Sequence, residues 1–364
     1  MKINNREMMT NRQFLFIVLF TNICVTPFVA PSLFFAHIGH GSYLPLVGIF
    51  LFTIGATYVA IKICEHFKEE NIVEWSRSLF GKWFGTLYGF AVIVIFYLWG
   101  YLMMYVFIEL IIYTQLPQTS RMLLIFFILA VTVYMLRQGL STFSRFVELF
   151  APLTLLILVL INVPQFKNVS FQHFLPFETL PEYGMGYFHY QIVSQLFMFR
   201  AVFIIYFFYP FIEKRGKLFR FAILATTISV LQVFLSIILP LGIFGKDFVK
   251  RLSFPYQESL ETVSITMLPL DRISILTSII WQLIILYVLY VSFFATISGI
   301  RSIFRFESER WLTYSLLTLT FFLALYPFSK DFIIKMIVYW SFAGIFVFGI
   351  VPFFVWLYVR SKKG

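Results

Sequence analysis

The stretch ISILTSIIWQLIILYVLYVSFFATISGI, residues 273–300, contains no charged side chain. A helix needs about 20 apolar residues to cross the ~30 Å hydrocarbon core of a bilayer, and this stretch exceeds that length. Within lipid, a helix satisfies its own backbone hydrogen bonds, whereas an open strand leaves them unpaired. The stretch is therefore predicted to be a transmembrane helix.

About ten apolar stretches of this kind cover nearly the whole chain, and short connectors carrying Lys and Arg separate them. We predict an all-α polytopic membrane protein with ten transmembrane helices and no separate soluble domain. The predicted spans are residues 13–36, 43–64, 79–113, 122–136, 146–163, 188–212, 218–244, 273–300, 311–325 and 332–359.

The composition restricts the classes of protein to consider. The 364 residues are 60% hydrophobic and only 12% charged, whereas soluble domains carry about 25% charged residues. Of the 28 Lys and Arg, 19 fall on one predicted side of the membrane, eight on the other, and Arg200 lies within a span. The positive-inside rule makes the richer side cytoplasmic, so both termini are predicted inside. We assign the net charge of +11 to topology and to anionic membrane lipid, with no nucleic-acid partner.

Signatures of metal or covalent chemistry are missing from the sequence. Cys24 and Cys64 lie within or beside predicted spans, which argues against a disulfide framework or a thiolate zinc site. The five histidines lack metal-ligand spacing. No phosphate-binding glycine loop or nucleophile elbow occurs. We therefore predict no metal, no cofactor and no enzymatic activity.

The predicted spans divide into two halves of five, residues 13–163 and 188–359. Because five is odd, the halves have opposite orientations in the membrane, as an inverted repeat requires. Such repeats place the binding site near the midplane, where matched helices are broken. We hypothesise a single permease-like domain over residues 1–364 that contains these two repeats.

The middle of the first span, TNICVTP at residues 21–27, is one candidate site. Pro27 and Pro31 each remove a helix donor and crowd the carbonyl four residues earlier. Asn22 and Thr26 lie one turn apart on a shared helix face, where they could bind freed carbonyls or a ligand. A proline kink with local hydrogen bonds explains the same pattern, so both interpretations remain open.

Arg200 is the strongest single candidate for a functional residue, because it lies about midway along the sixth predicted span. A cation at the bilayer centre costs at least about 2.5–3.5 kcal/mol, so its side chain should face protein or water. Three functional roles are open: binding a ligand carboxylate, pairing with Glu109 or Glu148, or capping the carbonyl end of a broken half-helix. A purely structural role is equally open. Among the many aromatic residues, we predict that Tyr97 and Tyr287 line a cavity.

Several segments, in their order and spacing, resemble the permease-like B-subunit family of bacterial spore germinant receptors, within the amino acid/polyamine/organocation permease superfamily. The resemblance extends over nearly the full length. The segments that carry it are LFGKWFG at 79–85, GLS at 139–141 with Arg145 and Pro152, YPF at 209–211 before Lys214 and Arg215, the outer segment 254–272, and the tail from 325–327 to 352–353.

The resemblance implies a LeuT-like 5+5 inverted-repeat fold in which helices one and six are broken. It also implies a complex with an A-type subunit and a C-type lipoprotein subunit in the bacterial cell membrane or spore inner membrane. In that family a small nutrient, often an amino acid, binds between the broken helices and triggers germination. The positions that match this site, together with the two tyrosines, are Asn22, Cys24, Val25, Thr26, Tyr97, Phe199, Arg200, Phe203 and Tyr287.

This chain departs from the family pattern at that site. Relatives carry a Gly-x-Gly break in helix one, where this chain has Cys24-Val25-Thr26. The glycine and glutamate often found in helix six are replaced by the bulky stretch FRAVF at residues 199–203. Bulk at these positions narrows a pocket and covers backbone carbonyls. The resemblance therefore transfers the fold, but not a free amino acid as ligand.

Three functions follow as hypotheses. The first is a germinant-receptor subunit that binds a small solute and shifts a conformational equilibrium, which requires different affinities for the two states. The second is a secondary transporter of amino acids or polyamines with the same fold. The third is a scaffold or channel element that has lost its ligand site.

Overall fold

The computed structural model describes residues 8–24, 26–35, 44–174, 200–263, 274–304 and 309–362. These residues form helices and turns, with one isolated β-bridge and no strand among them. The predicted all-α architecture is confirmed. Seven helical segments of the described chain are long and apolar enough to cross a bilayer.

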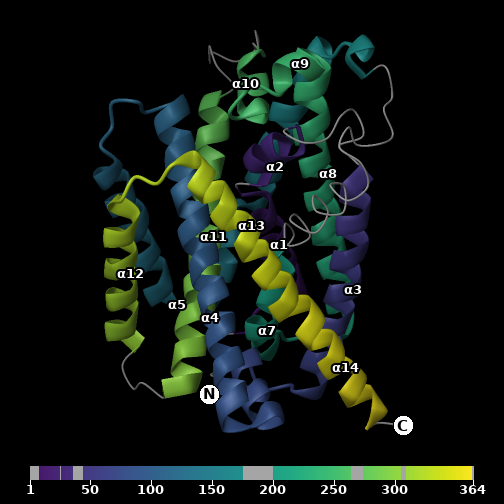
Figure 1. Cartoon of the computed structure of the whole chain (residues 1–364), viewed down its shortest axis with the longest axis vertical. Helices are drawn as coiled ribbons and strands as arrows, with labels where there is room; N and C mark the ends of the chain where they lie inside the picture. Colours follow the sequence, from purple (N-terminus) through teal and green to yellow (C-terminus); the bar gives the residue numbers. More distant parts are fainter. Residues whose placement is uncertain are drawn as a thin grey trace.

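The long described helices coincide with predicted spans, and the helices pack into one elongated bundle (Figure 1). Residues 188–199 of the predicted sixth span lie outside the described residues. The α-helices are α1 (Asn11–Ile23), α2 (Thr26–Phe35), α3 (Leu44–His66), α4 (Ile72–Thr114), α5 (Arg121–Asn162), α7 (Ile205–Phe208), α8 (Leu218–Phe244), α9 (Lys246–Val249), α10 (Pro255–Glu261), α11 (Ser274–Phe304), α12 (Glu309–Leu325), α13 (Lys330–Ile345) and α14 (Val351–Ser361). Shorter turns of 3-10 helix are η2 (Val163–Asn168), η3 (Phe171–Phe174), η4 (Arg200–Ile204), η5 (Tyr209–Phe211) and η6 (Arg215–Lys217), and η7 (Phe346–Ile350) is a π-helical turn.

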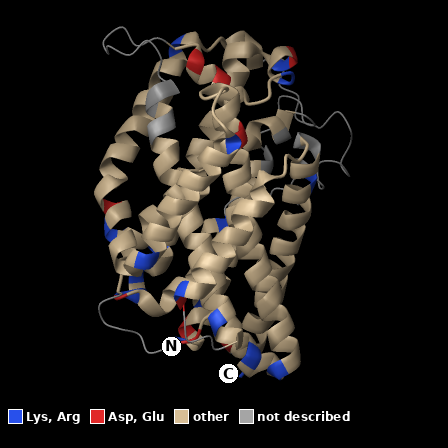
Figure 2. Ribbon diagram, turned by 90° about the vertical axis from the view of Figure 1, so that its left-hand side faces the viewer, with Lys and Arg blue, Asp and Glu red and all other residues tan. Residues whose placement is uncertain are grey.

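Charged and apolar side chains are distributed as a membrane requires. Figure 2 shows Lys, Arg, Asp and Glu gathered mostly toward the two ends of the bundle, with a largely uncharged middle. Large apolar side chains are exposed on the helices, for example Leu51, Phe84 and Leu149. Lipid is the solvent that makes such exposure favourable. Helix α14 ends at the end of the bundle where α1 starts, whereas α9 and α10 lie at the opposite end (Figure 1).

Helix α4 contains a sharp reversal at Gly81, where φ is 79°. Only glycine adopts this backbone conformation readily. The short arm before Gly81 folds back on the long arm, so that Ser76 Oγ donates a hydrogen bond of 3.2 Å to the carbonyl of Gly85. The long arm coincides with the predicted third span, residues 79–113.

Helix α5 reverses in the same way at Gly139, where φ is 82°. Its first arm starts beside the end of α4, since Arg121 pairs with Glu109, and Arg137 reaches Tyr314 at the start of α12. Its second arm starts beside α1 and finishes at α10, where Asn162 accepts a hydrogen bond from the Tyr256 hydroxyl. The two arms of α5 therefore run in opposite directions, and they coincide with the fourth and fifth predicted spans.

The first helix lies at the centre of the bundle. Nearly every residue of α1 is buried, and α1 packs against α8, α5 and α11. Long helices α4 and α11 approach closely where Gly100 meets Ser292, because a Cβ at position 100 would lie 2.4 Å from the serine Oγ. This close contact holds α4 and α11 together beside α1.

Candidate functional site

The first span is interrupted in its middle. Helix α1 ends at Ile23 and α2 begins at Thr26, with Cys24 as the C-terminal cap of α1. Pro27 occupies the second position of α2, where a missing backbone N–H costs nothing. Asn22 and Thr26 therefore belong to separate helices, and the single helix face that the sequence predicts for them is wrong. Val25, also predicted to bind ligand, lies outside the described residues.

Asn22 joins this interruption to the sixth span. Its Oδ1 accepts a hydrogen bond of 3.0 Å from the backbone N–H of Ala201, the second residue of η4. A backbone N–H can only donate, so this contact fixes which end of the amide carries oxygen. Asn22 Nδ2 is consequently a buried donor, and no described residue accepts a hydrogen bond from it.

The carbonyl of Cys24, the C-terminal cap of α1, is bound by a side chain from the eighth span. Trp281 Nε1 of α11 donates a short hydrogen bond to this oxygen. The indole ring packs edge-on against Phe28 of α2, with ring centroids 5.0 Å apart. Both Cys24 and Trp281 are only 1% exposed. The break is therefore held between three spans, the first, the sixth and the eighth.

Arg200 lies between two indole rings. Its guanidinium carbon is 4.7 Å from the ring centroid of Trp340 on α13 and 5.4 Å from that of Trp99 on α4. Its Nη2 is 2.9 Å from the Met103 sulfur. A cation over an indole face is attracted by the negative face of the π system. This arrangement joins the sixth span to the third and the tenth, and the side chain is buried, as the sequence predicts.

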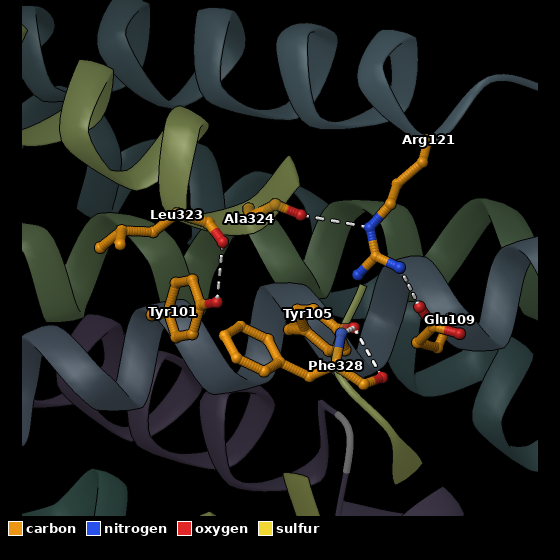
Figure 3. Close-up of polar contacts among 7 residues, drawn as sticks. All are labelled: Tyr101, Tyr105, Glu109, Arg121, Leu323, Ala324 and Phe328. Atoms are coloured by element: carbon orange, nitrogen blue, oxygen red, sulfur yellow. Dashed lines mark hydrogen bonds and ion pairs between the residues drawn. The ribbon is translucent and has the colours of Figure 1, made fainter. Parts of the chain in front are cut away.

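The acids considered as partners of Arg200 bind other cations. Glu109 pairs with Arg121 at the far end of α4, where Arg121 Nε also donates a 3.2 Å hydrogen bond to the carbonyl of Ala324 (Figure 3). Glu148 lies 3.1 Å from Arg12 and accepts a hydrogen bond from Gln13. Of the roles left open for Arg200, pairing with Glu109 or Glu148 is therefore wrong.

The Glu109–Arg121 pair belongs to a polar cluster that ties α12 to α4. Tyr101 donates its hydroxyl to the carbonyl of Leu323, 3.2 Å away, and Arg121 binds the next carbonyl (Figure 3). Carbonyls in the last turn of a helix have no partner within the helix, so side-chain donors stabilise its end. Tyr105 lies under Arg121 and binds Phe328 just beyond α12. This cluster is structural and lies away from the break.

The remaining predicted site residues are placed as follows. Phe203 stacks on Phe348, with ring centroids 5.4 Å apart. Tyr287 packs 6.2 Å from Phe20 on α1, and no described residue bonds its buried hydroxyl. Tyr97 faces α12, where its hydroxyl lies 3.2 Å from Thr320 Oγ1. Phe199 lies outside the described residues, and Thr26 is buried at the start of α2.

A ring of neutral polar side chains closes the bundle beyond α2. Asn162 donates to Gln232, Gln232 donates to Tyr256, and the Tyr256 hydroxyl donates back to Asn162, over 2.9 to 3.0 Å. These buried groups satisfy one another and hold α10 against α5 and α8. Tyr256 also packs on Phe28, with ring centroids 5.7 Å apart. The α10 helix is thereby tied to the outer half of the first span.

Main-chain hydrogen bonds join the residues before α1 to the residues at the end of the sixth span. Met9 N–H donates to the Phe211 carbonyl over 2.8 Å, and Glu213 N–H donates to the Met9 carbonyl over 3.1 Å. These two bonds pair Met9 with Ile212 as an isolated β-bridge. The chain entering α1 and the chain leaving the sixth span are therefore fastened together.

Comparisons with known proteins place the chain in a family. A model described as spore germination protein, of the spore permease type, matches residues 8–333. The chain belongs to the spore germination protein family. Its curated relatives include spore germination protein YndE of Bacillus subtilis, 21% identical over 87% of this chain and 86% of the relative. Spore germination protein A2 of the same organism is 21% identical over 86% of this chain and 84% of its own length.

Spore germination protein B2 of Bacillus subtilis is also 21% identical, over 68% of each chain. Family membership and the apolar helices make the protein an integral membrane protein. The family is of a permease type and is not an enzyme family.

A solved transporter shares the fold. The structure of Mhp1, a nucleobase-cation-symport-1 family transporter in a closed conformation with bromovinylhydantoin bound, superposes with a TM-score of 0.53. The match covers 94% of this chain and 78% of the Mhp1 chain, at 16% sequence identity. This chain and the transporter therefore share one fold despite little sequence identity.

Sequence reasoning missed Trp281, Trp99, Trp340 and Met103. A tryptophan in an apolar span is as typical of packing as of a polar contact, because only its indole N–H differs from a hydrocarbon. The usable signal was Arg200 itself, since a buried guanidinium requires acceptors or aromatic faces nearby.

Proposed function

We propose that this protein is the solute-sensing permease subunit of a nutrient germinant receptor in the spore inner membrane. The observation that supports this most is the hydrogen bond from Ala201 to Asn22, at the interruption of the first span. A broken helix with exposed polar backbone is stable within a membrane only where it faces protein or a ligand cavity. The site would bind a small nutrient, and partner subunits of the A and C types would transmit the response.

We also propose ten membrane crossings, arranged as repeats over residues 13–163 and 188–359 within one domain. The seven long apolar segments count the two arms of α5 once. Helix α12 has only 17 residues, and the apolar segment Arg200–Phe211 belongs to the sixth span. Adding the second arm of α5, α12 and this segment gives ten. An even number places both termini on one face, which the excess of Lys and Arg makes the cytoplasmic, or core, side.

Deleting the gene tests the receptor role. Spores without the protein are expected to lose their germination response to one class of nutrient, and a wild-type copy should restore it. Loss of optical density after nutrient addition measures the response, with spore yield as the control. Unchanged responses to every nutrient that triggers the parent strain would contradict the proposal.

The second candidate is a secondary transporter, which the shared fold with Mhp1 favours. Uptake of labelled solute into proteoliposomes separates the two functions. Saturable, gradient-driven flux through the isolated protein supports transport. Binding without flux supports a receptor that depends on its partner subunits.

A further inference from the structure

The break in the first span presents the carbonyl of Cys24, which a ligand could bind, but another side chain of the protein already donates a hydrogen bond to it. The last carbonyls of a half-helix lack helical partners and lie at the negative end of its dipole, where ammonium groups and cations bind well. In this chain the Cys24 carbonyl already accepts the indole N–H of Trp281. A ligand amino group would have to displace that indole.

A donor that no described residue binds lies beside this occupied acceptor. Asn22 Oδ1 is held by the Ala201 N–H at 3.0 Å, which leaves Nδ2 as a donor within the break. Asn22 is only 1% exposed, and no described residue accepts from its Nδ2. A buried polar group without a partner costs about 1–3 kcal/mol, so a ligand acceptor would be favoured here.

The positive charge of Arg200 near the break also favours a ligand oxygen. Arg200 is a buried cation that directly precedes Ala201, the residue whose N–H binds Asn22 at the break. The guanidinium is positive, which opposes an ammonium group and favours an oxygen acceptor. The donor and the charge therefore both select against a ligand amine.

We infer that Trp281 determines the specificity of this site: its indole N–H replaces a ligand amine at the Cys24 carbonyl, so that the site takes a small solute with a carbonyl or carboxylate oxygen and no ammonium group. Asn22 Nδ2 binds that oxygen. The inference rests on the proposed function, because it assigns a ligand class to the proposed sensing site. It also explains why the bulky side chain of Trp281 lies against the polar groups of the break.

Four probe compounds of similar size separate the alternatives. Lactamide offers a neutral carbonyl, lactate a carboxylate, isopropylammonium only an ammonium group, and L-alanine both charged groups. The full-length protein in lipid nanodiscs is mixed with each compound, and stabilisation against thermal unfolding gives the apparent affinity. Wild-type protein is expected to bind lactamide or lactate about tenfold more tightly than isopropylammonium, the factor that one hydrogen bond supplies.

Two conservative variants then test the named residues. Trp281→Phe keeps an aromatic ring but frees the Cys24 carbonyl, so isopropylammonium binding should strengthen about tenfold. Asn22→Asp keeps an acceptor for Ala201 but removes the Nδ2 donor, so the lactamide or lactate preference should disappear. Trp83→Phe and Asn168→Asp, at exposed positions, are matched controls that should leave the preference unchanged.

Three outcomes would overturn the inference. They are equal or tighter binding of isopropylammonium by the wild type, an unaltered preference in folded Trp281→Phe protein, and binding of none of the four compounds. Size-exclusion profiles establish that each variant is folded. The nutrient response of the deletion strain decides the receptor role separately, so the specificity assignment can fail while that role stands.

Discussion

Replacing Gly85 by leucine is expected to remove most of the protein from the membrane. A Cβ at this position would lie 2.5 Å from both the Cα of Arg77 and the carbonyl oxygen of Ser76. Both are backbone atoms of the short arm of α4, so no side chain can rotate away to make room. Opening this tight hairpin should cost more than about 3 kcal/mol, which exceeds the usual cost of an overpacked core.

Gly55→Leu is the matched control for this prediction. No atom lies within 4 Å of a Cβ built at Gly55, which lies on an exposed face of α3. The same change of residue type is therefore expected to leave abundance unchanged. An immunoblot of membrane fractions measures both variants. Equal abundance of the Gly85 and Gly55 variants would contradict the close contact between the arms of α4.

Replacing Arg200 by glutamine is expected to lower stability as well as response. Each cation–π contact contributes about 0.5–2 kcal/mol, and the guanidinium makes two, with Trp99 and Trp340. Removing a buried charge also relieves its desolvation, which opposes this loss. We expect net destabilisation, because the shorter side chain leaves a gap between two indole rings.

Arg200→Lys separates stacking from charge. Lysine keeps the positive charge but lacks the planar guanidinium that lies against the rings, so it should restore little stability. Arg220→Gln, on an exposed face of α8, is the control for loss of a cation. Thermal unfolding of purified protein and the nutrient response are measured together. A fully stable Arg200→Gln protein that fails only in the response would contradict the structural role and restore the ligand role.

Much of the architecture was predictable because spans and breaks are local features of the sequence. The prolines at 27 and 31 mark the interruption at Cys24, and the run lengths give the helices. Gly81 and Gly139 lie in the segments that carried the family resemblance, yet their positive φ angles needed coordinates. Only the backbone geometry shows that each glycine reverses a helix.

The contacts at the break were not predictable, because they join residues far apart in the chain. Trp281 binds the carbonyl of a residue 257 positions earlier. Similarly, the partners of Arg200 come from α4 and α13, and no single span signals that pairing. The π-helical turn at Phe346–Ile350, which aims Phe348 at Phe203, is likewise set by packing. Sequence reasoning therefore found the buried cation but not the aromatic rings that hold it.

An engineered disulfide can show whether the first and sixth spans are joined. Residues paired in a β-bridge lie near the Cα separation that disulfides need, about 4.4–6.8 Å. Met9→Cys with Ile212→Cys, on the paired residues, should therefore cross-link under mild oxidation. The control pair is Met9→Cys with Thr114→Cys, because Thr114 ends α4. We predict rapid, intramolecular cross-linking of the first pair alone. A first pair that stays reduced, or that reacts no faster than the control, would contradict the account.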